Sequence, residues 1–234
     1  MFGAPLHGAT LELVDQICDA LEAPGATWQK VVYSGLLPAL VQADPRVAAC
    51  VAENWEPGQI REGLLCEVGR EWEATGAEGA LAWAQGLANA GERNDVLGEV
   101  CAEISQTDPS EAVDVASRLG IGLGNDVLEG AAQLWAEKDF DSALGWALQQ
   151  PQGEQRDRLL GRVAFAESKT SPSSAASVVQ ESISPGPIQD EAAIAIAHQW
   201  GLRDSAAALA WVSSLPQGAL RERAQSELAG LAAR

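Results

Sequence analysis

Histidine, cysteine and long apolar stretches are scarce in this sequence of 234 residues, and their scarcity excludes several kinds of site. The only histidines are His7 and His198, and no two of the four cysteines form a C-x-x-C pair. A structural zinc site needs four clustered ligands, so we expect no metal site. No apolar run reaches the roughly 18 residues that span a bilayer, and residues 1–10 lack the basic start and apolar stretch of a secretory signal. We therefore expect a cytoplasmic protein without a membrane segment, whose cysteines are reduced and lie in the core.

Basic residues are also few, since 15 lysines and arginines face 33 aspartates and glutamates and give a net charge of −18. This balance argues against direct binding of DNA or RNA, whose phosphates attract Lys and Arg. The H-E-x-x-H, G-x-x-x-x-G-K-[ST] and G-x-S-x-G motifs are absent. With only two histidines, a nucleophile has few bases to activate it. We expect no catalytic residues and no cofactor.

An internal repeat of about 32 residues is the main organising feature of the chain. Its alanine anchors are spaced by 31 to 33 residues, and they are Ala48, Ala80, Ala112, Ala143, Ala175 and Ala208. Four residues before each anchor is a residue that can cap a helix, and these are Asp44, Gly76, Asp108, Asp139, Ser171 and Asp204. Apolar residues three and four positions after each anchor complete one stripe at helical spacing. Each anchor is therefore predicted to lie in a short helix.

A second apolar stripe precedes each anchor and predicts a longer helix before the short one, with Pro and Gly between repeats. The fold class that follows is all-α, an α-solenoid of about six helix-turn-helix hairpins with one flanking helix at each end. The predicted hairpins cover residues 27–55, 58–88, 93–119, 125–150, 154–183 and 188–215, and the terminal helices cover about 10–22 and 219–233. Because the repeat never breaks, we expect residues 1–234 to form a single domain.

The segment from Ala136 to Leu144, AEKDFDSAL, resembles the turn into the second helix of a tetratricopeptide repeat. An acidic cap, an aromatic residue and then a small alanine are typical of that turn, and residues 75–81 and 204–209 resemble it more loosely. The period of this chain is near 32, against about 34 in the family. The resemblance implies a divergent tetratricopeptide-like solenoid that binds a peptide or protein in a concave groove, without catalysis.

Six of the eight tryptophans occupy two positions of the repeat, and only in alternate hairpins. They are Trp72, Trp135 and Trp200 before the anchor, and Trp83, Trp146 and Trp211 after it. One interpretation is an aromatic ladder that stacks a ligand. The other is core filling, in which a large side chain in one hairpin matches a smaller one in the next. The tryptophans after the anchors lie on the same apolar stripe as the anchor alanines, and this favours core filling.

Acidic residues are concentrated in the first half, where residues 1–117 carry 19 acidic and 5 basic side chains. Glu67 and Glu99 share one repeat position, and Glu71 and Glu103 share another one helical turn later. Stacked hairpins would bring these four carboxylates together, and crowded like charges are mildly destabilising. They are our candidate binding residues, as an acidic patch for a basic segment of a partner. The alternative is a solvated acidic surface that keeps the chain soluble.

Arginines recur near the start of the predicted first helices, at Arg61, Arg93, Arg156 and Arg221, and we expect them to pair with neighbouring acids or with the preceding loop. The function predicted from the sequence is a non-catalytic scaffold that binds a protein or peptide on one face of the solenoid. Two alternatives remain open at this point. One is an acidic mimic of nucleic acid that inhibits a DNA- or RNA-binding protein, and the other is an enzyme with a carboxylate site in the groove.

Overall fold

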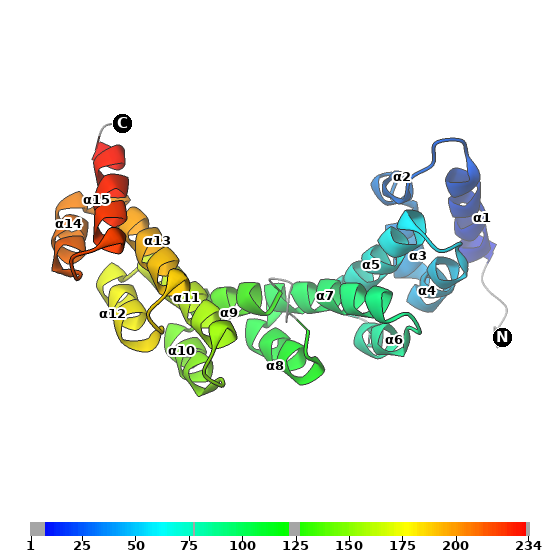
Figure 1. Cartoon of the computed structure of the whole chain (residues 1–234). Coiled ribbons are helices and arrows are strands. Elements are labelled where there is room, and N and C mark those ends of the chain that lie inside the picture. The colour runs from blue at the N-terminus through cyan, green and yellow to red at the C-terminus, as the bar shows by residue number, and fades with distance from the viewer. Residues whose placement is uncertain (1–7, 77, 122–126, 233–234) are drawn as a thin grey trace. The chain divides into compact units, whose positions relative to one another are not determined.

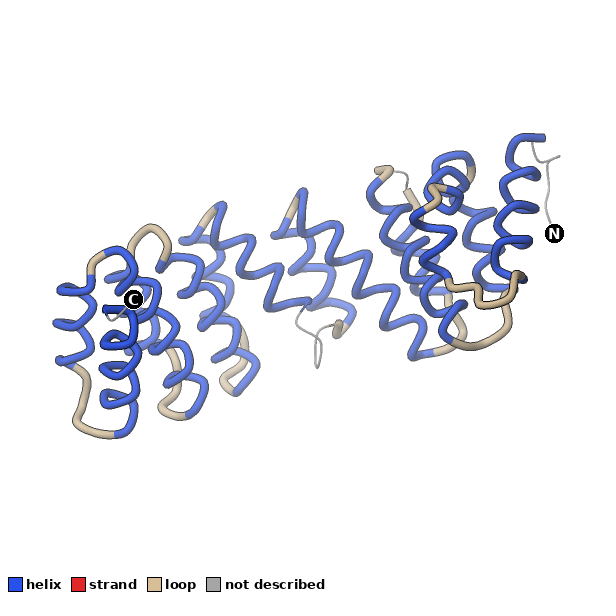
Figure 2. Tube along the Cα trace, turned by 90° about the horizontal axis from the view of Figure 1, so that it is seen from above, coloured by secondary structure: helices blue, strands red, loops and turns tan. Residues whose placement is uncertain are grey.

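The computed structural model describes residues 8–76, 78–121 and 127–232, and within these ranges all regular secondary structure is helical (Figure 2). The predicted all-α class is therefore confirmed. The helices are α1 (Gly8–Glu22), α2 (Trp28–Tyr33), α3 (Leu36–Ala43), α4 (Pro45–Asn54), α5 (Gln59–Ala74), α6 (Ala80–Gly86), α7 (Ala90–Thr107), α8 (Pro109–Leu119), α9 (Val127–Lys138), α10 (Phe140–Gln149), α11 (Glu154–Ser168), α12 (Pro172–Ser182), α13 (Pro187–Arg203), α14 (Ser205–Ser214) and α15 (Ala219–Ala232). No helix in the described ranges is long and apolar enough to cross a membrane.

Aspartate caps fix the start of most short second helices. The carboxylate of Asp44 accepts from the backbone N–H groups of Arg46 and Val47 at 3.0 and 3.3 Å, and Pro45 occupies the first position of α4. Asp108, Asp139 and Asp204 cap α8, α10 and α14 in the same way. Such a cap satisfies backbone donors that have no partner within the helix. The aspartate caps predicted from the repeat are thus confirmed.

The two predicted caps without an aspartate turn out differently. The helix predicted to begin near Gly76 begins later, because α6 starts at Ala80 and Gly79 adopts the left-handed conformation before it, with φ of +119°. Ser171 precedes α12, but its side chain makes no capping hydrogen bond. In the first hairpin, a long helix before Asp44 is also wrong, since Gly35 with φ of +79° divides it into α2 and α3.

The anchor alanines form the centre of the core. All six are between 0 and 1% exposed, as the repeat predicts. The first-helix stripe is equally buried, for example at Leu64, Leu65 and Val68 of α5. Small residues recur eleven positions before the anchors, at Gly69, Cys101, Ala132, Ala164 and Ala197. Gly69 shows the reason, because a Cβ on it would lie 2.8 Å from a methyl group of Val96 on α7. The helices approach one another too closely for a larger side chain.

The described helices group into two compact units, residues 1–107 and 108–234, so the boundary falls inside the predicted hairpin 93–119. In unit 1, α5 packs against α7, and α2, α3, α4 and α6 also contact α5. In unit 2, the first helices α9, α11, α13 and α15 contact one another in succession, and α10, α12 and α14 each contact the two first helices beside them (Figure 1). One continuous domain over 1–234 stays a prediction.

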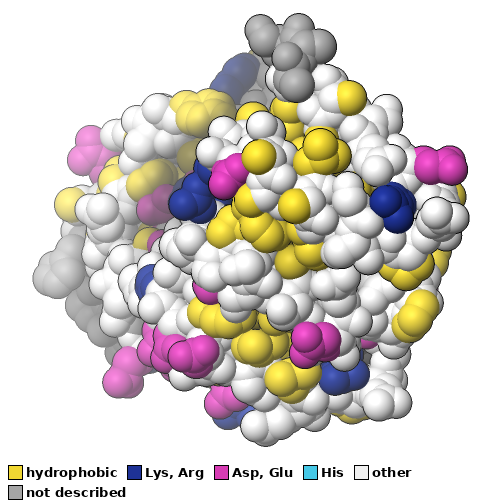
Figure 3. Space-filling model, turned by 90° about the vertical axis from the view of Figure 1, so that its left-hand side faces the viewer, with side chains coloured by type: hydrophobic (Ala, Val, Ile, Leu, Met, Phe, Trp, Pro, Cys, Tyr) yellow, Lys and Arg dark blue, Asp and Glu magenta, His cyan; other side chains and the backbone are white. Residues whose placement is uncertain are grey.

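The end of unit 2 at α14 and α15 exposes apolar side chains among relatively few charges (Figure 3). Leu202 of α13 and Leu209 of α14 are 60% and 48% exposed. The anchor-plus-one position that Leu209 occupies is buried at Ala49, Val113 and Ala176 and half-buried at Leu81 and Leu144 in earlier hairpins. Leu209 is therefore the most exposed side chain at this position of the repeat.

Candidate functional site

The four predicted acidic residues lie on two adjacent helices of unit 1, Glu67 and Glu71 on α5 and Glu99 and Glu103 on α7. They differ strongly in exposure, because Glu67 is only 8% exposed whereas Glu99 is exposed. Glu71 and Glu103 are half-buried. A carboxylate as buried as Glu67 needs a partner, and the sequence analysis did not name one.

Arg70 is that partner. Its Nη2 lies 2.5 Å from Oε1 of Glu67 and 2.7 Å from Oε1 of Glu71, and its Nε donates to the other oxygen of Glu67 at 3.2 Å. The hydrogen bond with Glu67 is the main reason why the pKa of Arg70 is raised, and Glu71 and Glu103 contribute electrostatically. The guanidinium of Arg70 thus pairs with two of the four predicted carboxylates, Glu67 and Glu71, and relieves the repulsion expected between them from the sequence.

Glu99 is one of the carboxylates that act on the thiol of Cys66. Burial raises the pKa of this thiol to about 12, and the negative charges of Glu99, Asp95, Glu62 and Glu67 add to the effect. Neither Glu99 nor Glu103 makes a hydrogen bond or ion pair within the described ranges. The predicted patch therefore consists of two carboxylates paired with Arg70, those of Glu67 and Glu71, and two without a hydrogen-bonded cation in the described ranges, those of Glu99 and Glu103.

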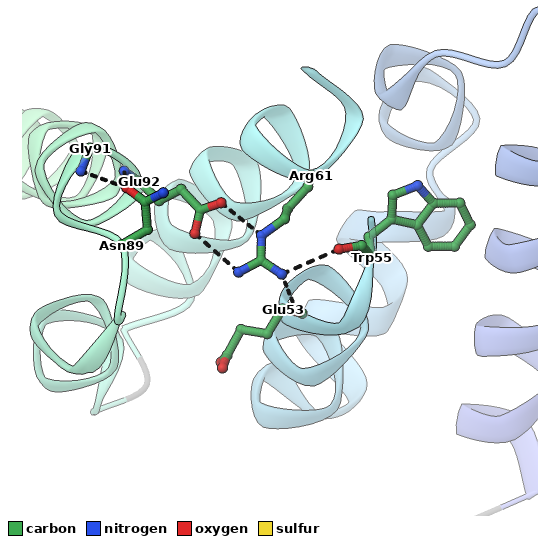
Figure 4. Close-up of polar contacts among 6 residues, drawn as sticks. All are labelled: Glu53, Trp55, Arg61, Asn89, Gly91 and Glu92. Atoms are coloured by element: carbon green, nitrogen blue, oxygen red, sulfur yellow. Dashed lines mark hydrogen bonds and ion pairs between the residues drawn. The ribbon is translucent and has the colours of Figure 1, made fainter. Parts of the chain in front are cut away.

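Arg61 joins two hairpins of unit 1 (Figure 4). Its Nε and Nη2 donate to the two carboxylate oxygens of Glu92 at 2.7 and 3.0 Å. Its Nη1 donates to the backbone carbonyls of Glu53 and Trp55, the latter at 3.2 Å. These carbonyls lie at the end of α4 and have no partner within the helix, so the guanidinium serves as the C-cap of one hairpin while belonging to the next.

The same contact recurs at most other repeat boundaries. Nη1 of Arg93 donates to the carbonyl of Leu87 at 2.8 Å, and that of Arg221 donates to the carbonyl of Leu215 at 3.3 Å. At the boundary between α12 and α13, Gln189 takes this role and donates to the carbonyls of Val179 and Ile183. The predicted pairing of these arginines with the preceding loop is confirmed at three positions. Arg156 differs, because its Nε is buried and makes no hydrogen bond.

The repeated tryptophans form one pair in each alternate hairpin. The ring centroids of Trp72 and Trp83 are 5.7 Å apart, and the corresponding pairs at Trp135 and Trp200 are separated by 6.1 and 5.9 Å. Trp72 is 3% exposed, whereas Trp83 is half-buried and its Nε1 donates to Glu53 at 2.7 Å. Each pair joins the first helix of a hairpin to the second, and this geometry favours core filling over a ligand ladder.

The cysteines and His198 lie at separate places in the fold. All four cysteines are free, but only Cys101 is fully buried, so the expectation of four core cysteines is wrong for Cys18, Cys50 and Cys66. His198 is half-buried, and its Nδ1 lies 2.7 Å from a carboxylate oxygen of Glu227 on α15. No group of three or more potential metal ligands occurs in the described residues.

No family model matches the chain. Searches of curated proteins and of solved structures also found no match. The argument for function therefore rests on the residues and contacts described above.

Proposed function

We propose that the chain is a non-catalytic interaction module, an α-solenoid of tetratricopeptide-like hairpins that binds a basic protein segment on the first-helix face of unit 1. The stacking of first helices within each unit and the aspartate caps at the hairpin turns support this arrangement. Repeat folds of this kind present extended faces for binding. The partner class follows from charge.

The observation that carries the proposal is the excess of carboxylates on α5 and α7. Arg70 compensates at most one of the four glutamates, and its hydrogen bonds go to Glu67 and Glu71. Glu99 and Glu103 remain without a hydrogen-bonded cation in the part of the chain that the structure describes. Lysine and arginine side chains of a partner can pair with them, and salt-sensitive association of this kind gains mainly in rate and specificity.

The test uses a fluorescently labelled twelve-residue peptide of alternating lysine, glycine and serine, measured by anisotropy against the full chain. The double variant Glu99→Gln/Glu103→Gln should weaken binding about fivefold, since two solvent-accessible charge contacts contribute about 1 kcal/mol together. The matched control Glu22→Gln/Glu56→Gln changes the net charge of the same unit equally at two exposed positions. If both double variants weaken binding alike, the peptide responds to overall charge and the proposed surface is wrong.

A further inference from the structure

The outer side of α15 carries a helix-docking position of the repeat with no helix on it in the described residues. In unit 2, each of α9, α11 and α13 contacts the next first helix. The residue eleven positions before the anchor in these helices is 0% exposed each time, at Ala132, Ala164 and Ala197. Ala229 of α15 follows Ala197 by 32 residues and therefore holds the same position, but it is exposed.

The first-helix pair of unit 1 shows how closely a helix packs at this position. A Cβ on Gly69 of α5 would lie 2.8 and 3.3 Å from side-chain carbons of Val96 and Val100 on α7. On α15, Ser226 and Gly230 lie beside Ala229 in the helix and are exposed as well. A Cβ on Gly230 would meet no atom within 4 Å. The outer side of α15 thus has room for a helix that approaches it at close range.

The neighbouring helix α14 extends this surface without adding charge. It contacts α15, and its sequence from Ser205 to Ser214 contains no charged residue. Its exposed side chains include Ala206, Leu209 and Ala210. Apolar side chains therefore gather at this end of unit 2 (Figure 3). We call the exposed side of α14 and α15 the end face.

Charge decides which occupant the end face favours. Residues 187–234 carry four basic and five acidic side chains, whereas residues 1–186 carry 11 basic and 28 acidic ones. Two copies of so acidic a chain repel each other over most of their surface, and the end face is nearly free of this repulsion. The exposed charges of α15 in the described residues are Glu222 and Arg223, which have opposite signs. A strongly charged partner gains little here, and the face instead fits a nearly neutral helix with small side chains, which α15 itself is.

We propose that two copies of the chain form a dimer through the end face, with the two α15 helices packed side by side. The opposite side of α15 packs on α13, so a second copy can offer only the same outer side of its own α15. Such a contact is isologous, and a two-fold axis relates the copies. The helices then run antiparallel and cross near Ser226, the middle of the exposed stretch from Glu222 to Gly230.

The two-fold arrangement continues an interface that unit 2 already uses between its first helices. It places Arg223 of one copy beside Ala229 and Gly230 of the other, near the carboxyl end of that copy's α15. A cation is favourable at this end of a helix. An isologous contact uses the same surface on both copies, so the assembly closes at two chains.

The first experiment is sedimentation velocity of the full chain from micromolar to millimolar concentration. We expect a single monomer–dimer equilibrium between 24.5 kDa and twice that mass. Ala229→Glu should raise the dissociation constant about 100-fold or more, because it brings like charges together across the interface. The matched control is Ala102→Glu, at an exposed alanine of the first helix α7 in unit 1. The control should leave the constant within a factor of two, and circular dichroism should show equal helix content in both variants.

A second experiment tests the two-fold axis itself. Ser226→Cys should form a disulfide-linked dimer when oxidised by oxidised glutathione, since a disulfide needs Cα atoms closer than about 7 Å. Ser177→Cys, at an exposed serine of α12 away from the end face, is the matched control, and the unchanged chain accounts for its four native cysteines. Cross-linking should be much stronger for Ser226→Cys than for either control.

Several results overturn the proposal. A monomer at every concentration would assign the end face to a different protein, and a dimer that Ala229→Glu leaves intact would place the contact elsewhere. Species that grow beyond two chains, or equal cross-linking of Ser226→Cys and Ser177→Cys, would exclude the two-fold pairing. None of these measurements involves the basic peptide of unit 1, so either proposal can fail without the other.

Discussion

Removal of the Arg61 side chain tests whether the contact between hairpins stabilises unit 1. Arg61→Ala deletes two hydrogen bonds to Glu92 and those to the carbonyls of α4. It also leaves the Glu92 side chain, 9% exposed, without its cation. Loss of one partner from a buried pair costs about 3–5 kcal/mol. Because the Arg61 side chain is itself 19% exposed, we expect the lower end, about 3 kcal/mol.

The matched comparison is Arg93→Ala, since Arg93 makes the equivalent contact through a carbonyl hydrogen bond and no ion pair in the described ranges. Its loss should cost about 1 kcal/mol. Hydrogen exchange of individual helices is the appropriate assay, because a chain with two compact units need not unfold in one transition. Relative to the wild type, exchange in α4 and α5 should speed up for Arg61→Ala, and exchange in α6 and α7 should speed up for Arg93→Ala. The difference of about 2 kcal/mol makes the first increase roughly 30-fold larger than the second.

A double-mutant cycle with Glu92→Ala separates the ion pair from the carbonyl contacts. The costs of the two single variants should add up to more than the cost of the double variant, because removal of both partners leaves no buried charge. Arg61→Lys keeps the charge but loses the bidentate geometry, so it should fall between the wild type and Arg61→Ala. Equal exchange for Arg61→Ala and Arg93→Ala, or strict additivity with Glu92→Ala, would show that the ion pair contributes nothing.

Three further predictions concern packing and protonation. A Cβ on Gly63 of α5 would collide with the indole of Trp28, so Gly63→Ala should displace the indole and destabilise unit 1 by about 1–3 kcal/mol. Gly145→Ala in α10 adds a Cβ with no atom near it and should stabilise the protein by about 0.5–1 kcal/mol. Urea titrations followed by circular dichroism compare the two variants. Burial raises the pKa of Cys66 to about 12 and that of Cys101 to about 11, so their contribution to stability should be complete below pH 9 and be lost as the pH rises toward these values. Both thiols should also resist iodoacetamide at pH 8 while the unfolded protein reacts, and rapid labelling of Cys66 or Cys101 in the native chain, located by peptide mass spectrometry, would contradict this. The hydrogen bonds from Ser142 lower the pKa of Asp139, so its cap should persist at pH 4 and be lost as the pH falls further, which exchange of the α10 amides in wild type and Asp139→Asn will measure.

Features set by local spacing were predictable from the sequence. The six anchors are buried and the four aspartates cap helices because both properties depend on residues within one helical turn. The break at Gly35 was missed because tertiary packing, and not a strong local stop signal, determines whether a glycine interrupts a helix. Eight residues before the anchor, the α11 hairpin has Glu167 where the other hairpins have Leu, Ile or Trp. The neighbouring Ser168 is fully buried, so that repeat is shifted by one residue.

The candidate sites were predictable only where they repeat. The acidic residues were found because they share positions in consecutive repeats, but Arg70 was missed although it lies three residues after Glu67, a spacing at which helical side chains meet. A groove in unit 2, lined by residues of α9, α11 and α13, could not be found in this way. Its lining residues come from three helices, and their positions in the repeat carry different residue types, so only the packed structure brings them together.

The boundary contacts have a consequence for rebuilding the chain from its parts. At four boundaries the donor side chain lies six residues after an acceptor carbonyl, in the pairs Trp55 and Arg61, Leu87 and Arg93, Ile183 and Gln189, and Leu215 and Arg221. The acceptor belongs to one hairpin and the donor to the next, with the same spacing each time. A hairpin excised or duplicated between equivalent points of two such boundaries regenerates the contact at the new junction. Hairpins with these boundaries can therefore be exchanged without loss of the boundary hydrogen bond. One residue inserted between acceptor and donor changes the spacing of six residues and is enough to abolish that hydrogen bond.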